Sequence, residues 1–371
     1  MRILQIGKFY PIKGGVERVM LDLTTGLVSC GYRCDMLCAA NNSRPLVKDL
    51  GDGNRLIALK SLAEVKSTMI SPAMIHFMRK HCGDYDIVHI HHPDPMACLA
   101  LRLSGYKGKV VLHWHSDIFR QSKLLRFYRP LQNWLLKRAD HIIGTTETYI
   151  KNSPALQPYL DKCSCVPIGI DPIVLNHTRA EQIRNMYPGK KIIFSLGRMV
   201  AYKGFGFLIE SAKYLSDDYI ILIGGSGPMK KEFDEQVEED GLSNKVKLLG
   251  LIKDEDVAAY YEACDIYCMS SIFKNEAFGI VQLEAMSVGR PIVSTAIKGS
   301  GVSWVNKDGE SGLVVSPENS EALASAFKKI METPGLYENL SSQSAKRFEE
   351  LFRKEKMIES CIAIYSSLMS R

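Results

Sequence analysis

The chain contains no apolar run long enough to cross a membrane. A transmembrane helix needs about 20 predominantly apolar residues, and no window of the sequence reaches that length without interruption. The apolar run at the N-terminus ends at Gly7 and Lys8, which is too short for the core of a secretory signal peptide. These absences exclude a membrane span and a signal sequence, so we expect a cytoplasmic protein.

Paired cysteines and short repeats are also missing. The ten cysteines form no CxxC pair and no zinc-type spacing, which indicates reduced, mostly buried thiols. Hydrophobic residues make up 46% and charged residues 24% of the chain, close to the globular average. Wholesale disorder, collagen and long coiled coil are therefore excluded.

Charge of one sign is only slightly in excess. The 47 basic and 41 acidic residues give a formal net charge of +6. This balance would suit phosphate-bearing small molecules, an anionic membrane surface or nucleic acid. The net charge alone does not choose among these partners.

Short apolar strands alternate with amphipathic helices along the whole chain, which predicts an α/β fold with parallel sheets. The first set of predicted strands comprises residues 2–7, 33–38, 86–91, 109–113 and 141–145. The second set comprises residues 191–197, 219–224, 245–250, 265–269, 291–295 and 312–315. Two doubly wound, Rossmann-like domains are the simplest arrangement of these elements.

A stretch rich in proline and glycine separates the two sets, with Pro167, Gly169, Pro172, Pro188 and Gly189. We place the boundary near residue 175. The N-terminal domain then covers residues 1–175 and the C-terminal domain residues 176–353, while a final helix, residues 354–371, is expected to pack back on the N-terminal domain.

Ligands of α/β sheets bind where strands end, so the turns between strands and helices are the first candidates. Gly14 and Gly15 directly precede a helix whose N–H groups favour an anion, although a plain turn would look the same. After the strand 191–197, Arg198 and Lys203 lie in one loop and Gly204 opens a helix. Two cations beside a helix start would suit a diphosphate.

Two further turns carry unusual residues. Residues 224–228 read GGSGP, a glycine-rich turn that lets the backbone approach a ligand closely. Glu276 lies in a loop, and Glu284 follows it in a helix among apolar residues. A carboxylate in such surroundings needs hydrogen-bonding partners, and sugar hydroxyls are natural donors.

These turns, taken together and in this order, resemble the retaining glycosyltransferases of family 4, over essentially the whole chain. The most specific element is the pair of glutamates with seven residues between them, Glu276 and Glu284, with Phe278 and Gly279 in the expected place. The family has the GT-B fold, in which two Rossmann-like domains face each other across a cleft.

The resemblance implies roles for individual residues. Arg198 and Lys203 would bind the donor diphosphate, and Gly14 and Gly15 would contact it through the backbone. Glu284 would bind the ribose and Glu276 the donor sugar. The remaining donor contacts would come largely from the backbone, at Gly225, Gly227, Ile252, Ala277, Phe278, Gly279, Ile280 and Val281.

No cofactor or metal is expected. Preorganised cations and N–H groups can stabilise the negative charge of a departing nucleoside diphosphate. The DxD-like string, which runs from Asp254 to Asp256, is better interpreted as a helix N-cap with acids in the first turn. We therefore predict metal-independent transfer.

A histidine-rich segment lies in the N-terminal half. His115 matches the histidine that faces the donor sugar in the family, although the polar residue that usually follows is matched only loosely by Ser116 and Asp117. A zinc site is a weaker alternative, since alternation places His89 and His91 on one strand face, near His92, His113 and His115.

The segment from Arg120 to Arg138 contains six basic residues, no acidic residue and interleaved apolar residues. Such a helix would suit an anionic membrane surface or a lipid diphosphate. A helix packed on its own domain with a solvated basic face fits equally well. No recognition motif accompanies the charge, so nucleic acid is not an expected partner.

The predicted activity is transfer of a hexose from a nucleotide-sugar donor, with retention, to a glycan or polyprenyl-diphosphate-linked acceptor in cell-surface polysaccharide biosynthesis. The opening KFYPIKGGVERV and residues 299–305 resemble bacterial O-antigen, lipopolysaccharide or capsule mannosyltransferases. This resemblance makes GDP-mannose the first candidate for the donor. The alternatives are a UDP-hexose transferase (glucose, galactose or N-acetylglucosamine), a nucleotide-sugar epimerase and, more remotely, a noncatalytic nucleotide- or lipid-binding module.

Overall fold

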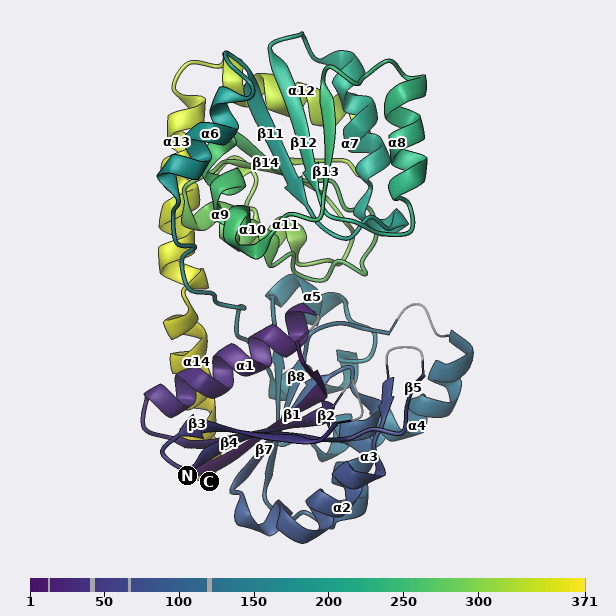
Figure 1. The fold of residues 1–371 in the computed structure, drawn as a ribbon. Helices are drawn as coiled ribbons and strands as arrows, with labels where there is room; N and C mark the ends of the chain where they lie inside the picture. The colour runs from purple at the N-terminus through teal and green to yellow at the C-terminus, as the bar shows by residue number, and fades with distance from the viewer. Residues whose placement is uncertain (13, 41–43, 66–67, 119–121, 371) are drawn as a thin grey trace. The chain divides into compact units, whose positions relative to one another are not determined.

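The computed structural model describes residues 1–12, 14–40, 44–65, 68–118 and 122–370, without the side chains of 122–125 and 127. The chain forms two compact units (Figure 1). Unit 1 comprises Met1–Gly169 together with Lys354–Arg371, and unit 2 comprises Ile170–Arg353. The division thus follows Gly169 rather than residue 175. The predicted α/β class with two Rossmann-like domains is confirmed.

Unit 1 is built on an eight-stranded sheet with the order β10-β9-β8-β7-β1-β2-β4-β3. All its neighbours are parallel except β3 and β4. The strands are β1 (Arg2–Tyr10), β2 (Arg33–Ala40), β3 (Leu46–Gly51), β4 (Asn54–Lys60), β7 (Ile87–His92), β8 (Lys109–Trp114), β9 (His141–Gly144) and β10 (Cys163–Cys165). A separate hairpin consists of β5 (Ala63–Val65) and β6 (Thr68–Ile70).

The helices of unit 1 cover both faces of the sheet. They are α1 (Gly15–Ser29), α2 (Pro72–His81), α3 (Pro95–Ser104), α4 (Ser122–Arg138), α5 (Glu147–Asn152) and α14 (Lys354–Met369), with the 3-10 helices η1 (Cys82–Asp84) and η2 (Gln157–Lys162). In Figure 1, α1 and α14 lie on one face of the sheet and α2 and α3 on the other.

Unit 2 is built on a six-stranded parallel sheet with the order β13-β12-β11-β14-β15-β16. Its strands are β11 (Lys191–Leu196), β12 (Tyr219–Gly224), β13 (Val246–Gly250), β14 (Ile266–Met269), β15 (Ile292–Thr295) and β16 (Gly312–Val315). Its α-helices are α6 (His177–Asn185), α7 (Phe205–Ser211), α8 (Lys230–Glu239), α9 (Asp254–Ala263), α10 (Val281–Ser287), α11 (Val302–Val305), α12 (Ser320–Glu332) and α13 (Leu336–Arg347).

The strands form because their sequences are nearly continuous apolar runs, as parallel strands buried on both faces require. All six residues of β12, YIILIG, are buried. Helix boundaries follow capping signals. In α3, the side chain of Asp94 accepts hydrogen bonds from the backbone N–H groups of Met96 and Ala97, and Gly105 ends the helix in the left-handed conformation.

The final helix, α14, packs on α1 within unit 1. A Cβ atom at Gly26 of α1 would lie 2.1 Å from Cδ1 of Ile358, so the two helices approach closely at this glycine. The Tyr365 side chain is fully buried beneath α14. This helix therefore belongs to the core of unit 1 although it is distant in sequence.

Some elements were not predicted from the sequence. Residues 46–60 form the β3–β4 hairpin, whose outer strand β3 is almost fully exposed and has no apolar face to signal it. Among the described residues, no helix is long and apolar enough to cross a membrane. All ten cysteines are free thiols, and seven of them are buried.

Candidate active site

The predicted donor residues of unit 2 follow three neighbouring strands. The strand order reverses between β11 and β14, and in such sheets ligands bind at this switch point, outside the carboxyl ends of the strands. Arg198 and Lys203 follow β11, the glycine-rich turn follows β12, and Glu276 follows β14. The fold therefore gathers these residues at one edge of the sheet.

Lys203 and Glu276 form an ion pair across the switch point. Nζ of Lys203 lies 2.6 Å from Oε2 of Glu276, and both side chains are only about one-eighth exposed. Burial lowers the pKa of Lys203, but the neighbouring Glu276 carboxylate outweighs it, so the net pKa is raised. The lysine is therefore charged at neutral pH and placed where an anionic ligand would be stabilised.

The Glu276 loop is held by serine side chains. The hydroxyl of Ser271 donates to Oε2 of Glu276 over 3.4 Å, and the hydroxyl of Ser300 donates to its backbone carbonyl over 2.5 Å. The hydroxyl of Ser270 donates to the carbonyl of Lys203 over 2.9 Å. Both members of the ion pair are thus positioned by the segment after β14.

The glycine-rich turn lies directly against the Arg198 loop. Gly225 has a φ of +124°, and a Cβ there would lie 1.9 Å from the carbonyl oxygen of Gly197. A Cβ at Gly227 would lie 2.3 Å from the carbonyl oxygen of Met199. Only glycine fits at either position, because a side chain would push the loop that carries Arg198 away.

Arg198 is exposed between these two contacts, whereas Lys203 is mostly buried. The sequence grouped them as two cations of one loop, and the structure gives them different surroundings. Gly204 has a φ of +65° and caps α7, as the loop sequence predicted. An exposed guanidinium beside a buried ammonium can contact two parts of one diphosphate.

Glu284 lies on α10 beside the hydroxyl of Tyr261. Burial, together with the neighbouring charge of Glu284, raises the pKa of Tyr261 well above its usual value. A buried tyrosine is therefore close enough to this carboxylate to feel its charge. Glu284 itself is half-buried.

The segment from Ala277 to Val281 turns into α10 at Gly279, which has a φ of +81°. Phe278 is buried, and Ile280 is half-buried at the N-cap. Ile252 is also half-buried, and it covers Gly224 at the end of β12, where a Cβ would lie 2.4 Å from its Cδ1.

The DxD-like string occupies the start of α9. Lys253 is the N-cap, so Asp254 is the first helical residue rather than the cap that the sequence indicated. The carboxylate of Asp256 pairs with Arg179 of α6, with 2.9 Å between Oδ1 and Nε. This aspartate therefore joins two helices of unit 2.

In unit 1 the strand order reverses between β1 and β7. Gly14 is the N-cap of α1 and Gly15 its first residue, so the helix begins one residue earlier than the sequence indicated, and both glycines are exposed. A Cβ at Gly14 would lie 2.9 Å from Oε2 of Glu17, which is buried. Burial raises the pKa of Glu17, and the charge of Lys8 opposes this shift.

His115 lies at the end of a chain of buried hydrogen bonds. Its Nε2 lies 2.9 Å from Nδ1 of His91, and Nε2 of His91 lies 2.8 Å from Oε1 of Gln5. Nε2 of Gln5 donates to the hydroxyl of Tyr365 over 3.2 Å, and this hydroxyl lies 2.5 Å from Nδ1 of His89. The chain runs from α14 through β1 and β7 to the residue that follows β8.

The amide of Gln5 sets the direction of every bond in this chain. Its oxygen can only accept, so His91 carries its proton on Nε2 and accepts at Nδ1 from Nε2–H of His115. The lone pair of His115 is therefore on Nδ1. Burial, with the other histidines adding to it, lowers the pKa of His115 well below its usual value, so the ring is neutral.

A metal at the histidine cluster does not fit this geometry. The ligand atoms of His89, His91 and His113 lie within 4.8 Å of one another. However, the rings are stacked, with planes only 8° apart for His89 and His91 and 27° apart for His91 and His113. In-plane lone pairs of stacked rings do not converge on one ion, and both nitrogens of His91 are already hydrogen-bonded.

Sequence reasoning missed Gln5, His91 and Tyr365 as members of the His115 chain. A polar glutamine within the apolar strand β1 was the available signal, since a buried amide needs partners. Tyr365 gave no signal, because its contacts are made by residues far apart in the sequence.

Two families match nearly the whole chain. Residues 13–173 match the family described as Glycosyltransferase Family 4, and residues 177–347 match the one described as Glycosyl transferases group 1. The chain is 30% identical to the O-antigen chain mannosyltransferase C of Escherichia coli, over 100% of this chain and 99% of that protein. It is also 30% identical to the D-rhamnosyltransferase WbpZ of Pseudomonas aeruginosa, over 95% of this chain and 92% of that protein.

Solved structures show the same fold at lower identity. The sucrose-phosphate synthase of Thermosynechococcus elongatus has a TM-score of 0.78 and 20% identity, with all of both chains covered. HepE of Anabaena, solved with UDP, also has a TM-score of 0.78, at 19% identity over 99% of this chain and all of the other. The protein belongs to the family 4, group 1 glycosyltransferases and has the GT-B fold.

Proposed function

We propose that the protein transfers a hexose from a nucleotide-sugar to a glycan or lipid-linked acceptor in cell-surface polysaccharide biosynthesis, without a metal and with retention of the anomeric configuration. The observation that carries this proposal is the Lys203–Glu276 ion pair at the switch point of unit 2. It joins a cation suited to a diphosphate with a carboxylate suited to sugar hydroxyls.

The proposed chemistry follows from charge. Cleavage of the bond between sugar and diphosphate builds negative charge on the leaving nucleotide, and fixed cations stabilise that charge. Lys203 is held in place by Glu276 and Ser270, so it needs little rearrangement to act. Arg198 supplies a second positive charge, which takes the part that a metal plays in other transferases.

GDP-mannose is the proposed donor. Two relatives with near-complete coverage are a mannosyltransferase and a D-rhamnosyltransferase, and D-rhamnose is mannose without its 6-hydroxyl. A site that accepts the mannose stereochemistry at C2 accounts for both. A UDP-hexose is the second candidate, because the structural neighbour HepE was solved with UDP and with UDP-glucose.

We propose that the protein binds lipid-linked acceptors at an anionic membrane surface. Its contact with that surface would be electrostatic. Leu135 and Leu136 of α4 are buried in unit 1, so this part of the helix already uses its apolar face. Arg126 and Lys137 remain exposed, whereas Arg138 pairs with Asp140 over 2.9 Å. Arg120 lies outside the described residues. Exposed basic residues near a surface attract anionic lipids without insertion.

The test is a transfer assay with GDP-mannose and with UDP-glucose, in the presence of a chelator, using the membrane lipid fraction of the source cells as acceptor. We expect mannose in the product, with the α-linkage of the donor retained in its NMR spectrum. Transfer of glucose in place of mannose would show that UDP-glucose is the donor. A product with inverted anomeric configuration would overturn the proposed retention. A strict metal requirement would overturn the role given to Arg198 and Lys203.

A further inference from the structure

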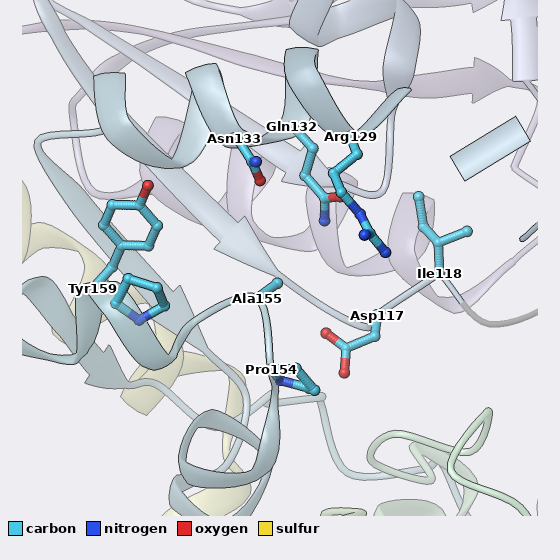
Figure 2. A pocket seen from close by; sticks show the side chains of 9 residues that line it. Asp117, Ile118, Arg129, Gln132, Asn133, Pro154, Ala155 and Tyr159 are labelled. Atoms are coloured by element: carbon cyan, nitrogen blue, oxygen red, sulfur yellow. The ribbon is translucent and has the colours of Figure 1, made fainter. Parts of the chain in front are cut away.

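A pocket of about 490 Å³ lies within unit 1, between α4 and the segment that connects α5 to η2. Its volume falls in the range of roughly 300–1,000 Å³ that is typical of small-molecule sites. Figure 2 shows its lining, and we refer to it as the α4 pocket. The lining residues are Asp117, Ile118, Arg129, Gln132, Asn133, Pro154, Ala155, Pro158 and Tyr159.

We propose that the α4 pocket binds a sugar ring of the acceptor. This inference rests on the proposed function, because it assigns the acceptor of that reaction to a place in unit 1. The pocket combines polar side chains that donate and accept hydrogen bonds with apolar side chains that can cover the C–H face of a pyranose. Neutral polyhydroxyl ligands require this mixture.

One polar wall is fixed before any ligand arrives. Oδ1 of Asp117 accepts hydrogen bonds from Nε1 of Trp114 over 3.0 Å and from the hydroxyl of Ser153 over 2.6 Å. The backbone N–H of Asp117 donates to the hydroxyl of Tyr149 over 2.8 Å. A carboxylate that is already ordered loses little entropy when it accepts a sugar hydroxyl.

The opposite wall is one face of α4. Arg129, Gln132 and Asn133 lie one turn apart or adjacent on the helix, and Figure 2 shows their polar ends directed into the pocket. Gln132 is 6% exposed, so its amide is nearly buried at the pocket wall. Pro154, Ala155 and the ring of Tyr159 form the apolar side.

The charges of the walls favour a neutral ligand. Figure 2 shows the carboxylate of Asp117 and the guanidinium of Arg129 facing the same space from opposite sides. A phosphate that approached Arg129 would also meet the negative charge of Asp117, whereas hydroxyl groups can donate to one and accept from the other.

The position of the pocket also fits an acceptor. Asp117 follows His115 by two residues, at the carboxyl end of β8, so both lie at the same edge of the sheet. The lone pair of His115 is on Nδ1, which is buried. A sugar in the α4 pocket would be held at the strand end that carries His115.

The test measures binding of simple sugars to the full-length protein. Saturation-transfer NMR with the methyl glycosides of mannose, glucose, galactose and N-acetylglucosamine should detect binding of at least one. Arg129→Ala and Asn133→Ala, both at exposed positions, should each weaken that binding tenfold or more, about 1.4 kcal/mol. The matched control is Lys151→Ala on α5, whose exposed ion pair with Glu147 lies outside the pocket.

Unaltered sugar binding in both pocket variants would overturn the proposal, as would failure of all four glycosides to bind. Displacement of the sugar by inorganic phosphate would reassign the pocket to an anion. A nucleotide-induced thermal shift, measured in the same samples, separates this inference from the proposed function. If the shift persists while no sugar binds, the transferase assignment stands and only the α4 pocket loses its ligand.

Discussion

Nζ of Lys203 lies 2.6 Å from Oε2 of Glu276, although the two residues follow different strands of the sheet. Each side chain is nearly buried. Ser271 contacts the carboxylate of Glu276, and Ser270 contacts the backbone carbonyl of Lys203. The two opposite charges therefore form one ion pair at the switch point of unit 2.

Lys203→Met should reduce transfer by about 10²–10³-fold, because removal of one preorganised group that stabilises the transition state has effects of this size. The decrease should appear in kcat at saturating donor. The matched control is Lys213→Met, which removes the more exposed ion pair with Asp240 on the same unit and should leave turnover unchanged. Equal turnover of Lys203→Met and the wild type would contradict the assignment.

Gly225→Ala should destabilise unit 2 and weaken nucleotide binding together. The new Cβ would lie 1.9 Å from the carbonyl of Gly197, at a φ of +124°. Overpacking and backbone strain of this kind cost about 2–4 kcal/mol in urea unfolding. Gly241→Ala, at a φ of +67° with open space around the Cβ, should lose only the strain and should bind nucleotide normally. Similar losses in both variants would refute the close-packing explanation.

Tyr365→Phe tests the hydrogen-bond chain that reaches His115. It removes the hydroxyl that contacts His89 and Gln5 in the core of unit 1, and buried donors or acceptors left unpaired cost about 1–3 kcal/mol. Without this hydroxyl the Gln5 amide can rotate. It then no longer fixes which ring nitrogen of His91 carries the proton. We therefore expect a changed pH profile of kcat as well as lower stability. A loss of stability with an unchanged profile would show that the chain is only structural.

The buried histidines should make the protein sensitive to acid. Burial lowers the pKa of His92 and of His113 to about 3, so both are neutral in the folded state. Below the usual histidine pKa near 6.5, the unfolded chain binds more protons than the folded protein. The free energy of unfolding therefore falls as the pH decreases. Each such histidine adds up to about 1.4 kcal/mol per pH unit to this slope.

His113→Leu should therefore reduce the slope of the urea-unfolding free energy against pH between pH 6 and 4. The reduction should correspond to about one fewer proton taken up on unfolding. The control is His76→Leu, at an exposed position of α2, which should leave the slope as in the wild type. The same slope in His113→Leu and the wild type would mean that His113 is protonated in the folded state as well.

The residues that we propose to bind the donor could largely be grouped from the sequence. Arg198, Lys203, Gly225 and Glu276 each lie in a turn or loop that follows an apolar strand, and parallel strands bring their carboxyl ends to one edge. Local signals and one topological rule were therefore enough to group them. The ion pair itself was not predicted, since its geometry depends on how two loops far apart in the sequence are packed.

The N-terminal half carried less information. The β3–β4 hairpin has an exposed outer strand with no hydrophobic alternation. The partner of His89 is Tyr365, contributed by the last helix of the chain, and only folding brings the two together. The α4 pocket combines residues from three separate elements with no shared motif, so its existence follows from packing alone.

The most direct test of the account is binding of GDP, UDP and their sugar conjugates to the full-length protein in the presence of a chelator. A ligand at about 100 times its dissociation constant should stabilise the folded protein by roughly 2.7 kcal/mol, which a thermal-shift experiment detects. We predict a metal-independent shift with GDP-mannose that is lost in Lys203→Met and kept in Lys213→Met. A shift that appears only with added magnesium, or that is equal in the two variants, would contradict the central claim.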